Sequence, residues 1–179
     1  MNRIELLESI SRYDTPFGEE AVFLPLFEEL LAHPRAYYRD HLPGHITASS
    51  WIVDKKRQHV LLVYHAKLNR WLQPGGHADG DEDVVAVARK EAEEETGLRN
   101  LTLTTPRIFD LDVHVIPARQ NFPEHFHYDV RFCFQTSMDE PLVISEESHD
   151  LRWVEFGDVN ELTGRNKSIQ RMLEKSRNT

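Results

Sequence analysis

An acidic segment constrains this chain more than any other feature of its sequence. Eight acidic residues lie between Asp79 and Glu95. Surface helices usually alternate acidic and basic residues, because like charges three or four positions apart repel each other. Here Glu91, Glu94 and Glu95 occur at that spacing with no basic residue between them. At about 100° per residue their carboxylates share one stripe, so the segment predicts a helix that binds a cation.

The helix is predicted over residues 83 to 96. Asp81 or Asp83 can cap its first turn, and Gly97 stands where a left-handed residue commonly ends a helix. The apolar residues at helical spacing, which predict a buried stripe, are Val85, Ala88 and Ala92. One face of this helix is therefore expected in a core while the acidic stripe faces a ligand.

The acidic stripe favours Mg²⁺ or Mn²⁺ as its cation, because both prefer hard oxygen ligands. Zinc sites prefer His and Cys, and calcium loops take their ligands from alternate residues of a bent loop rather than from a continuous helix. The pattern leaves the number of ions open.

Residues 76 to 98 resemble the signature of the Nudix hydrolases. That signature is glycine, five residues, glutamate, seven residues, Arg-Glu, an apolar residue, any residue, Glu-Glu, any residue, glycine and an apolar residue. The matching positions are Gly76, Glu82, Glu91, Ala92, Glu94, Glu95, Gly97 and Leu98. Lys90 replaces the arginine, which in the family orients a motif glutamate, and a lysine offers a point charge in place of a planar fork.

The resemblance implies a fold and a class of reaction. The implied fold is α/β, a Nudix-type α/β/α sandwich with a mixed sheet. The implied activity is metal-dependent hydrolysis of a phosphoanhydride bond in a nucleoside diphosphate linked to another group. The partner implied is thus a small nucleotide-type substrate. The leaving group and the nucleobase of this substrate are not indicated, because the family markers for ADP-ribose and dinucleoside polyphosphates are absent around His114.

The acidic segment supplies the expected metal ligands. Glu91 and Glu95 are expected to bind metal directly, because they lie i, i+4 on one helix face. Glu94 is expected as a third ligand or as the base that accepts a proton from the attacking water. Gly76 is expected to offer its backbone carbonyl, since glycine permits close approach, and Glu82 to stabilise the loop or to bind metal through water.

A base from outside the motif is a further expectation. Glu147 is the first choice, followed by Glu146 and Asp150. These three residues lie in the turn-like stretch 145–150 just before a predicted strand, from which a loop carboxylate could reach the metals. The alternative interpretation is a solvated acidic loop.

Three histidines are expected to bind substrate. His77 follows Gly76 in the loop nearest the predicted metals. His125 and His127 alternate, so on a strand they face the same side and could contact substrate phosphates or an extra metal. The alternative is that they are hydrogen-bonded residues at the end of a loop.

The rest of the chain predicts one domain with an extension. Residues 1–44 are expected to form a helical N-terminal extension with helices over 4–11 and 19–32, and residues 45–179 the Nudix domain. The strands expected in that domain are 46–53, 60–64, 101–104, 107–115, 128–136 and 151–155, with a last helix over 159–175. Residues 46–64 read as a hairpin around the charged turn 54–57.

Charge and composition limit the kinds of partner that the chain is expected to bind. A net charge of −9 argues against non-specific binding to nucleic acid or to anionic lipid. Residues 1–13 contain neither a secretory signal nor a membrane span, so the cytoplasm is expected. Cys133 lies in an apolar run and is expected as a buried thiol in a strand. Residues 1–44 could cap the domain or form a homodimer surface.

Two other function classes stay open. A ligand-binding regulator on the same fold would be expected to lose metal-binding glutamates, whereas Glu91, Glu94 and Glu95 are all present. A diphosphate isomerase would need a reactive cysteine, whereas Cys133 lies in an apolar setting that does not activate a thiol.

Overall fold

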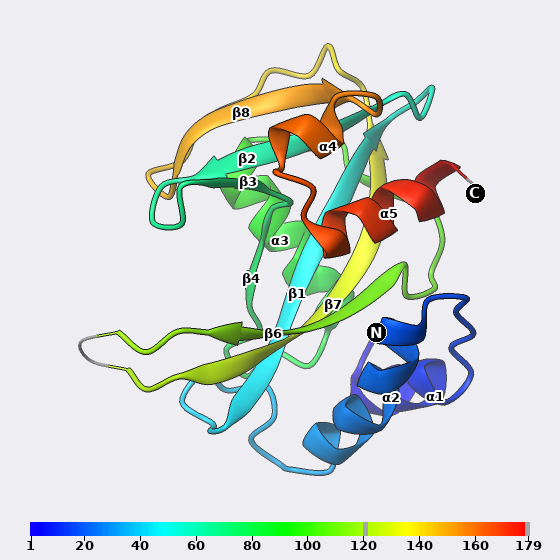
Figure 1. The fold of residues 1–179 in the computed structure, drawn as a ribbon, viewed down its shortest axis with the longest axis vertical. Helices are drawn as coiled ribbons and strands as arrows, with labels where there is room; N and C mark the ends of the chain where they lie inside the picture. Colours follow the sequence, from blue (N-terminus) through cyan, green and yellow to red (C-terminus); the bar gives the residue numbers. More distant parts are fainter. Residues whose placement is uncertain (120–121, 178–179) are drawn as a thin grey trace.

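The protein consists of a mixed sheet between two layers of helices (Figure 1). The structure is a computed structural model and describes residues 1–119 and 122–177. The helices are α1 (Arg3–Ser11), α2 (Gly18–Leu31), α3 (Val84–Thr96), α4 (Val159–Leu162) and α5 (Lys167–Arg177). The strands are β1 (Gly44–Asp54), β2 (His59–His65), β3 (Arg70–Leu72), β4 (Gly75–His77), β5 (Thr102–Leu103), β6 (Asp110–Ile116), β7 (His125–Thr136) and β8 (Ser148–Glu155). The predicted α/β/α fold with a helical N-terminal part is confirmed.

The sheet is organised around β1 and β7. These two strands pair in parallel from Gly44↔Phe126 to Asp54↔Thr136. β2 and β4 pair antiparallel with β1, while β5 and β6 pair antiparallel with β7, and β3 and β8 extend the sheet from β2. The predicted hairpin of β1 and β2 is confirmed by the pair Val53↔Val60.

Alternation along β1 divides the core into two layers. Ile46 and Ile52 belong to the cluster that contains the apolar side chains of α1, α2 and α3. Trp51 and Val53 point to the other face and pack with Ile169 and its neighbours on α5. Because successive residues of a strand face opposite sides, one strand supplies both layers.

The acidic helix α3 is closed at both ends as the sequence predicts. The side chain of Asp83 accepts a hydrogen bond from the backbone N–H of Ala86 at 3.1 Å, and Gly97 adopts a left-handed φ of 77°. The buried stripe differs in part from the prediction: Ala88 and Ala92 are buried as expected, but Val84 and Val87 are buried in place of Val85, which is only partly buried. The apolar stripe therefore includes the first residue of the helix, which packs under the sheet.

Residues 1–44 share the core of the rest of the chain. Leu6, Ile10 and Phe27 are buried in the same cluster as Ile46 of β1. The division of the chain at residue 44 stays a prediction, and the structure adds that α1 and α2 pack directly on the sheet layer.

A buried ion network also ties α2 to α5. Lys175 Nζ lies 2.6 Å from a carboxylate oxygen of Glu20, and Arg171 Nε lies 2.8 Å from Asp110 on β6. Arg131 of β7 pairs with the same aspartate at 3.1 Å. Buried charges of this kind need partners, because an unpaired charge in the interior is costly. The network fixes the N-terminal helices against the sheet.

Two local features differ from the sequence prediction. The predicted last helix is two helices, α4 and α5, because Gly164 and Arg165 adopt φ of 62° and 58° between them. The short strands β3 and β4 were not expected. Cys133 is buried in β7, which confirms its prediction. No helix within the described residues is both long and apolar enough to span a bilayer.

Candidate catalytic and metal site

β4 brings the glycine pair of the motif against the acidic helix. The backbone N–H of Gly75 donates a hydrogen bond to Oε1 of Glu95 at 3.2 Å. A Cβ on Gly76 would lie 2.3 Å from Oε2 of Glu91. A Cβ on Gly75 would lie 2.2 Å from Oγ of Ser49 on β1. Glycine at position 75 lets β4 approach Ser49 of β1, and glycine at position 76 leaves room for the Glu91 carboxylate beside the strand.

Glu91 and Glu95 are carboxylates held in a poorly solvated place. Glu95 is 8% exposed, and burial raises its pKa to about 8, with the negative charges of Glu91 and Glu147 adding to the effect. Burial also raises the pKa of Glu91, followed by the charge of Glu94. Within residues 1–119 and 122–177, neither carboxylate forms an ion pair with a lysine or an arginine.

This donor set fits a divalent cation of the predicted kind. Two carboxylates that repel each other in a buried place are stabilised by a nearby positive charge. Oxygen donors suit Mg²⁺ or Mn²⁺. The narrow gap beside Gly76 also leaves the Glu91 carboxylate next to the backbone of β4. Glu91 and Glu95 are thus the residues that would hold the ion.

The other two motif glutamates are engaged elsewhere. Glu94 is exposed on α3, and Nζ of Lys90 lies 3.7 Å from its carboxylate. Lys90, which replaces the motif arginine, therefore pairs with Glu94. Glu82 lies before the helix, where the guanidinium of Arg3 contacts it at 2.8 Å. The roles predicted for Glu94 and Glu82 remain predictions, and the structure gives each of them a basic partner.

Glu147 lies close enough to affect both candidate ligands. It occupies the turn before β8, and its backbone carbonyl accepts a hydrogen bond from the N–H of Ala66 at 2.9 Å. Its negative charge raises the pKa values of both Glu91 and Glu95. Asp150, one of the other candidates, pairs instead with Arg152 at 3.4 Å.

The three predicted substrate-binding histidines lie together with two others. Nε2 of His125 lies 3.3 Å from Nε2 of His127, and the rings of His77 and His127 are 4.9 Å apart. His45 and His114 join them, with ring centroids 5.0 and 5.5 Å from that of His127.

Three of these rings, those of His45, His77 and His127, have lowered pKa values because they are buried. Burial lowers the pKa of His45 to about 4, helped by the neighbouring His77. Burial also lowers the pKa of His127 to about 2, with His77 and His114 as the next causes. Each ring resists protonation because solvent is excluded and the adjacent imidazoles oppose a positive charge.

Three residues near the site were missed by sequence analysis. His45 begins the run His45, Thr47, Ser49 on alternate positions of β1, and that polar alternation could have marked a polar sheet face. His114 was noted only as the place where a substrate marker is absent. Arg39, which pairs with Asp79 and interacts with the charges of Glu91 and Glu147, had no sequence signal.

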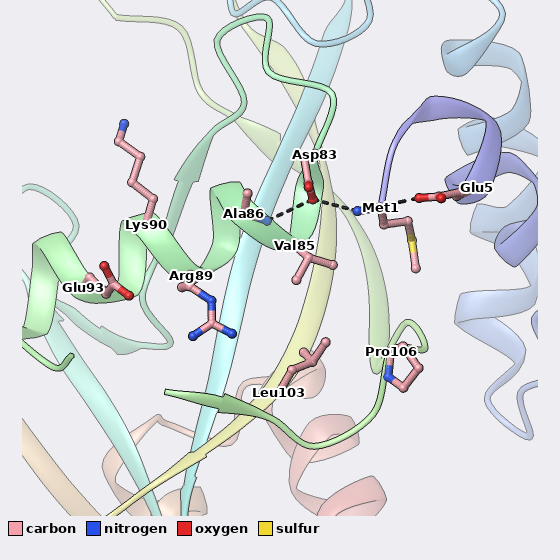
Figure 2. A pocket seen from close by; sticks show the side chains of 10 residues that line it. All are labelled: Met1, Glu5, Asp83, Val85, Ala86, Arg89, Lys90, Glu93, Leu103 and Pro106. Atoms are coloured by element: carbon pink, nitrogen blue, oxygen red, sulfur yellow. Dashed lines mark hydrogen bonds and ion pairs between the residues drawn. The ribbon is translucent and has the colours of Figure 1, made fainter. Parts of the chain in front are cut away.

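A pocket of about 690 Å³ lies on the opposite side of α3, and Figure 2 shows it between the helix, Leu103 of β5 and the first residues of the chain. Arg89 and Glu93 line it from the helix. Glu93 is two positions, or about 200°, away from both Glu91 and Glu95 around the helix axis, and Arg89 is two positions away from Glu91. The pocket is therefore separate from the carboxylate site.

Comparisons with known proteins match both the sequence and the fold. The NUDIX domain family matches residues 43–175. A solved Ap4A hydrolase from C. elegans, a binary complex, aligns with a TM-score of 0.59 and 19% identity over 73% of this chain and 93% of its own. A NUDIX-family hydrolase from Clostridium perfringens aligns with a TM-score of 0.58 and 24% identity, over 74% and 96%. The E. coli dihydroneopterin triphosphate pyrophosphohydrolase aligns with a TM-score of 0.60 and 16% identity, over 75% and 96%.

A comparison with curated protein sequences found no match to this chain. The solved structures are similar to it in fold. The family match extends over most of the chain and includes β4, the acidic helix α3 and the strands of the sheet. The chain therefore belongs to the NUDIX domain family.

Proposed function

We propose that the protein is a divalent-metal-dependent pyrophosphohydrolase acting on a small nucleotide-type substrate, in which a nucleoside diphosphate is linked to another group. The Ap4A hydrolase and the dihydroneopterin triphosphate pyrophosphohydrolase that share its fold support this substrate class. Mg²⁺ or Mn²⁺ is the proposed cofactor. The sequence-based expectations of a cytoplasmic location and of a dimer surface on residues 1–44 remain predictions.

The observation that carries the proposal is the adjacent pair of carboxylates beside β4, of which Glu95 is buried and Glu91 half-buried. Glu91 lies against Gly76, Glu95 accepts a hydrogen bond from Gly75, and no cationic side chain of the described residues pairs with either. A structural role alone gives no reason to bury two adjacent carboxylates without a cation, since each carries a desolvation cost. A metal-binding role explains both the acids and the glycines.

The proposed roles follow from charge and position. Glu91 and Glu95 hold the cation, which when bound neutralises charge on the phosphate oxygens and acidifies a water. Arg39 interacts electrostatically with Glu91 and Glu147, and its guanidinium pairs with Asp79, so a substrate phosphate would compete with Asp79 for this cation. The hydrogen bond from Gly75 orients the Glu95 carboxylate.

Glu147 is the proposed general base. Its charge interacts with both Glu91 and Glu95, whereas that of Glu94 interacts with Glu91 alone. Glu94 is also exposed and paired with Lys90, so its carboxylate is committed to solvent and to the lysine. A base must reach the attacking water at hydrogen-bond distance, and a loop residue can adjust to do so.

The proposal is tested by a panel of nucleoside triphosphates, dinucleoside polyphosphates, nucleotide sugars and ADP-ribose. Each is incubated with purified protein and Mg²⁺ or Mn²⁺, and the release of nucleoside monophosphate or phosphate is measured. Glu95→Gln is expected to lower turnover by about 10²-fold or more, because it removes charge stabilisation of the transition state. Glu147→Gln is expected to lower kcat by about 10²-fold, as loss of a general base does.

Glu93→Gln is the matched control. Glu93 lies on the same helix but on the side of the separate pocket, so its loss should leave turnover unchanged. Hydrolysis of no member of the panel by folded protein would reject the enzymatic proposal and favour the binding regulator. Near-normal turnover of Glu95→Gln would reject the ligand assignment.

A further inference from the structure

Histidines form a row across four neighbouring strands, on the face of the sheet away from α3. β4, β1, β7 and β6 lie side by side in that order (Figure 1). His45 of β1 is the direct partner of His127 of β7, and His127 is the partner of His114 of β6. His77 of β4 pairs with Thr47, two residues along β1 from His45. Strand register therefore brings these imidazoles together, since partner side chains lie about 5 Å apart.

Three of these rings converge on one point. One ring nitrogen each of His45, His77 and His127 lie within 4.8 Å of one another. Their ring centroids are 4.9 to 5.2 Å apart. The three residues come from three different strands, so the backbone of the sheet fixes their spacing.

The hydrogen bonds of His45 determine which of its nitrogens is free. Its Nδ1 lies 3.4 Å from the backbone carbonyl oxygen of His41, which can only accept, so Nδ1 carries the proton. Nε2 is then left with a lone pair, and among residues 1–119 and 122–177 it has no hydrogen-bond partner although His45 is only 1% exposed. A buried, unsatisfied acceptor costs about 1–3 kcal/mol. A ligand that accepts this lone pair removes the cost.

Two further histidines, His125 and His114, lie beside the three converging rings and are held by neighbouring groups. Nδ1 of His125 donates to the carbonyl oxygen of Pro123 at 2.9 Å, which leaves its Nε2 as an acceptor 3.3 Å from His127. His114 contacts a carboxylate oxygen of Asp112 at 3.0 Å and lies beside His127. Among the three converging rings, His45 has a carbonyl partner in His41, and such a partner fixes the tautomer and orientation of an imidazole ligand.

We propose that His45, His77 and His127 form a second metal centre, distinct from the carboxylate site, for a borderline transition-metal ion such as Zn²⁺. Neutral imidazole prefers zinc, copper, nickel and cobalt, whereas the carboxylates of α3 prefer magnesium or manganese. Three protein nitrogens leave a fourth position open to water or to an anionic oxygen.

The geometry is compatible with this ion after small ring rotations. Two nitrogens on a tetrahedral zinc, each at about 2.05 Å, are about 3.3 Å apart. The three nitrogens here lie within 4.8 Å, and side-chain torsions can close the difference because the strands already hold the three Cβ atoms on one face. The centre adjoins the carboxylate site through β4, where His77 directly follows Gly76.

The test uses untagged full-length protein stripped with a chelator, since a polyhistidine tag would bind the same metals. Co²⁺ is added in the presence of excess Mg²⁺, which occupies the oxygen site, and the visible absorption bands of tetrahedral cobalt are recorded. We expect one equivalent of Co²⁺ to give these bands and Zn²⁺ to abolish them. Zn²⁺ affinity is then measured by competition with a chromophoric chelator.

The variants separate this centre from the catalytic one. His77→Gln and His127→Gln are expected to lose the bands and to weaken Zn²⁺ binding by roughly 100-fold or more. His77→Gln is the variant expected to fold without difficulty, because His77 is only partly buried and lies at the end of β4. His149→Gln removes an exposed histidine outside the cluster, and Glu95→Gln removes a proposed ligand of the other site. Both controls are expected to keep the bands.

Two outcomes would overturn the proposal. The first is that no tetrahedral band appears, or that the band persists in both His77→Gln and His127→Gln. The second is that ADP binds metal-free protein and loses its affinity in those variants, which would make the histidines direct phosphate contacts. Hydrolytic activity is not the readout, so failure of this proposal and failure of the proposed function are distinguishable.

Discussion

Replacement of Glu95 by glutamine should remove a pH-dependent loss of folding stability that the metal-free protein shows. Glu95 is 8% exposed, and its pKa is raised from 4.5 to about 8. The folded protein therefore binds the Glu95 proton more tightly than the unfolded chain does, so this group lowers the stability as the pH rises from about 4.5 to 8. Glutamine imitates the protonated form and carries no such cost.

The magnitude follows from the pKa values. At ~1.4 kcal/mol per pKa unit, the interval from 4.5 to about 8 sets a ceiling of about 5 kcal/mol. About 4 kcal/mol of this falls between pH 5 and pH 8.5, because the cost is already partly present at pH 5. The stability difference between Glu95→Gln and wild type is expected to grow by that amount over this range.

The assay is urea unfolding in a chelator, followed by tryptophan fluorescence at a series of pH values, and the three tryptophans provide the signal. The difference between the two proteins is the informative quantity, because the titration of the buried histidines contributes equally to both. Excess Mg²⁺ at pH 8 should restore stability to wild type more than to the variant, since the metal binds the ionised carboxylate. A difference that stays within about 1 kcal/mol across the pH range would refute the reasoning.

Three further predictions concern other parts of the molecule. Gly76→Ala should lower kcat by about 10²-fold with the fold retained, because the added Cβ would lie 2.3 Å from the Glu91 carboxylate. Gly157→Ala is the control and should leave kcat unchanged, because its Cβ would meet nothing within 4 Å among the described residues. Steady-state kinetics of both variants test this prediction. Arg3→Gln should lower the free energy of unfolding, measured in urea, by about 1 kcal/mol, because it removes the contacts of Arg3 with Glu82 and with three backbone carbonyls. The kcat of this variant should stay unchanged if Glu82 has no direct catalytic role. Cys133 should resist alkylation in the native protein, because burial raises the pKa of its thiol. Cys133→Ala should keep full hydrolytic activity. Rapid labelling of Cys133 would instead favour the isomerase alternative.

The local pattern of the sequence determined the acidic helix. Asp83, Gly97 and the spacing of the alanines specify its start, end and buried face, because caps and helical periodicity depend on residues close together in the chain. The glycine pair and the glutamates likewise follow from a short motif. Strand existence was also predictable for β1 and β7, whose apolar alternate residues are numerous.

The partners of the motif glutamates were not predictable from the same pattern. The contact of Arg3 with Glu82 joins residues 79 positions apart, and nothing local in either segment indicates it. The pairing of Lys90 with Glu94 is local, yet helical spacing alone did not show that Glu94 faces solvent. Side-chain exposure depends on what packs against the helix, which only the fold decides.

The sequence by itself therefore determined the family, the acidic helix and the residue types available for metal binding, because each of these depends on residues close together in the chain. Tertiary structure alone decided that Glu95 is buried beside Gly75, and that His45 and His127 face each other across β1 and β7. The physical reason is that both arrangements join separate elements: α3 packs against β4, and the parallel pairing sets β1 beside β7, where a shift by one residue would turn His45 or His127 to the opposite face of the sheet.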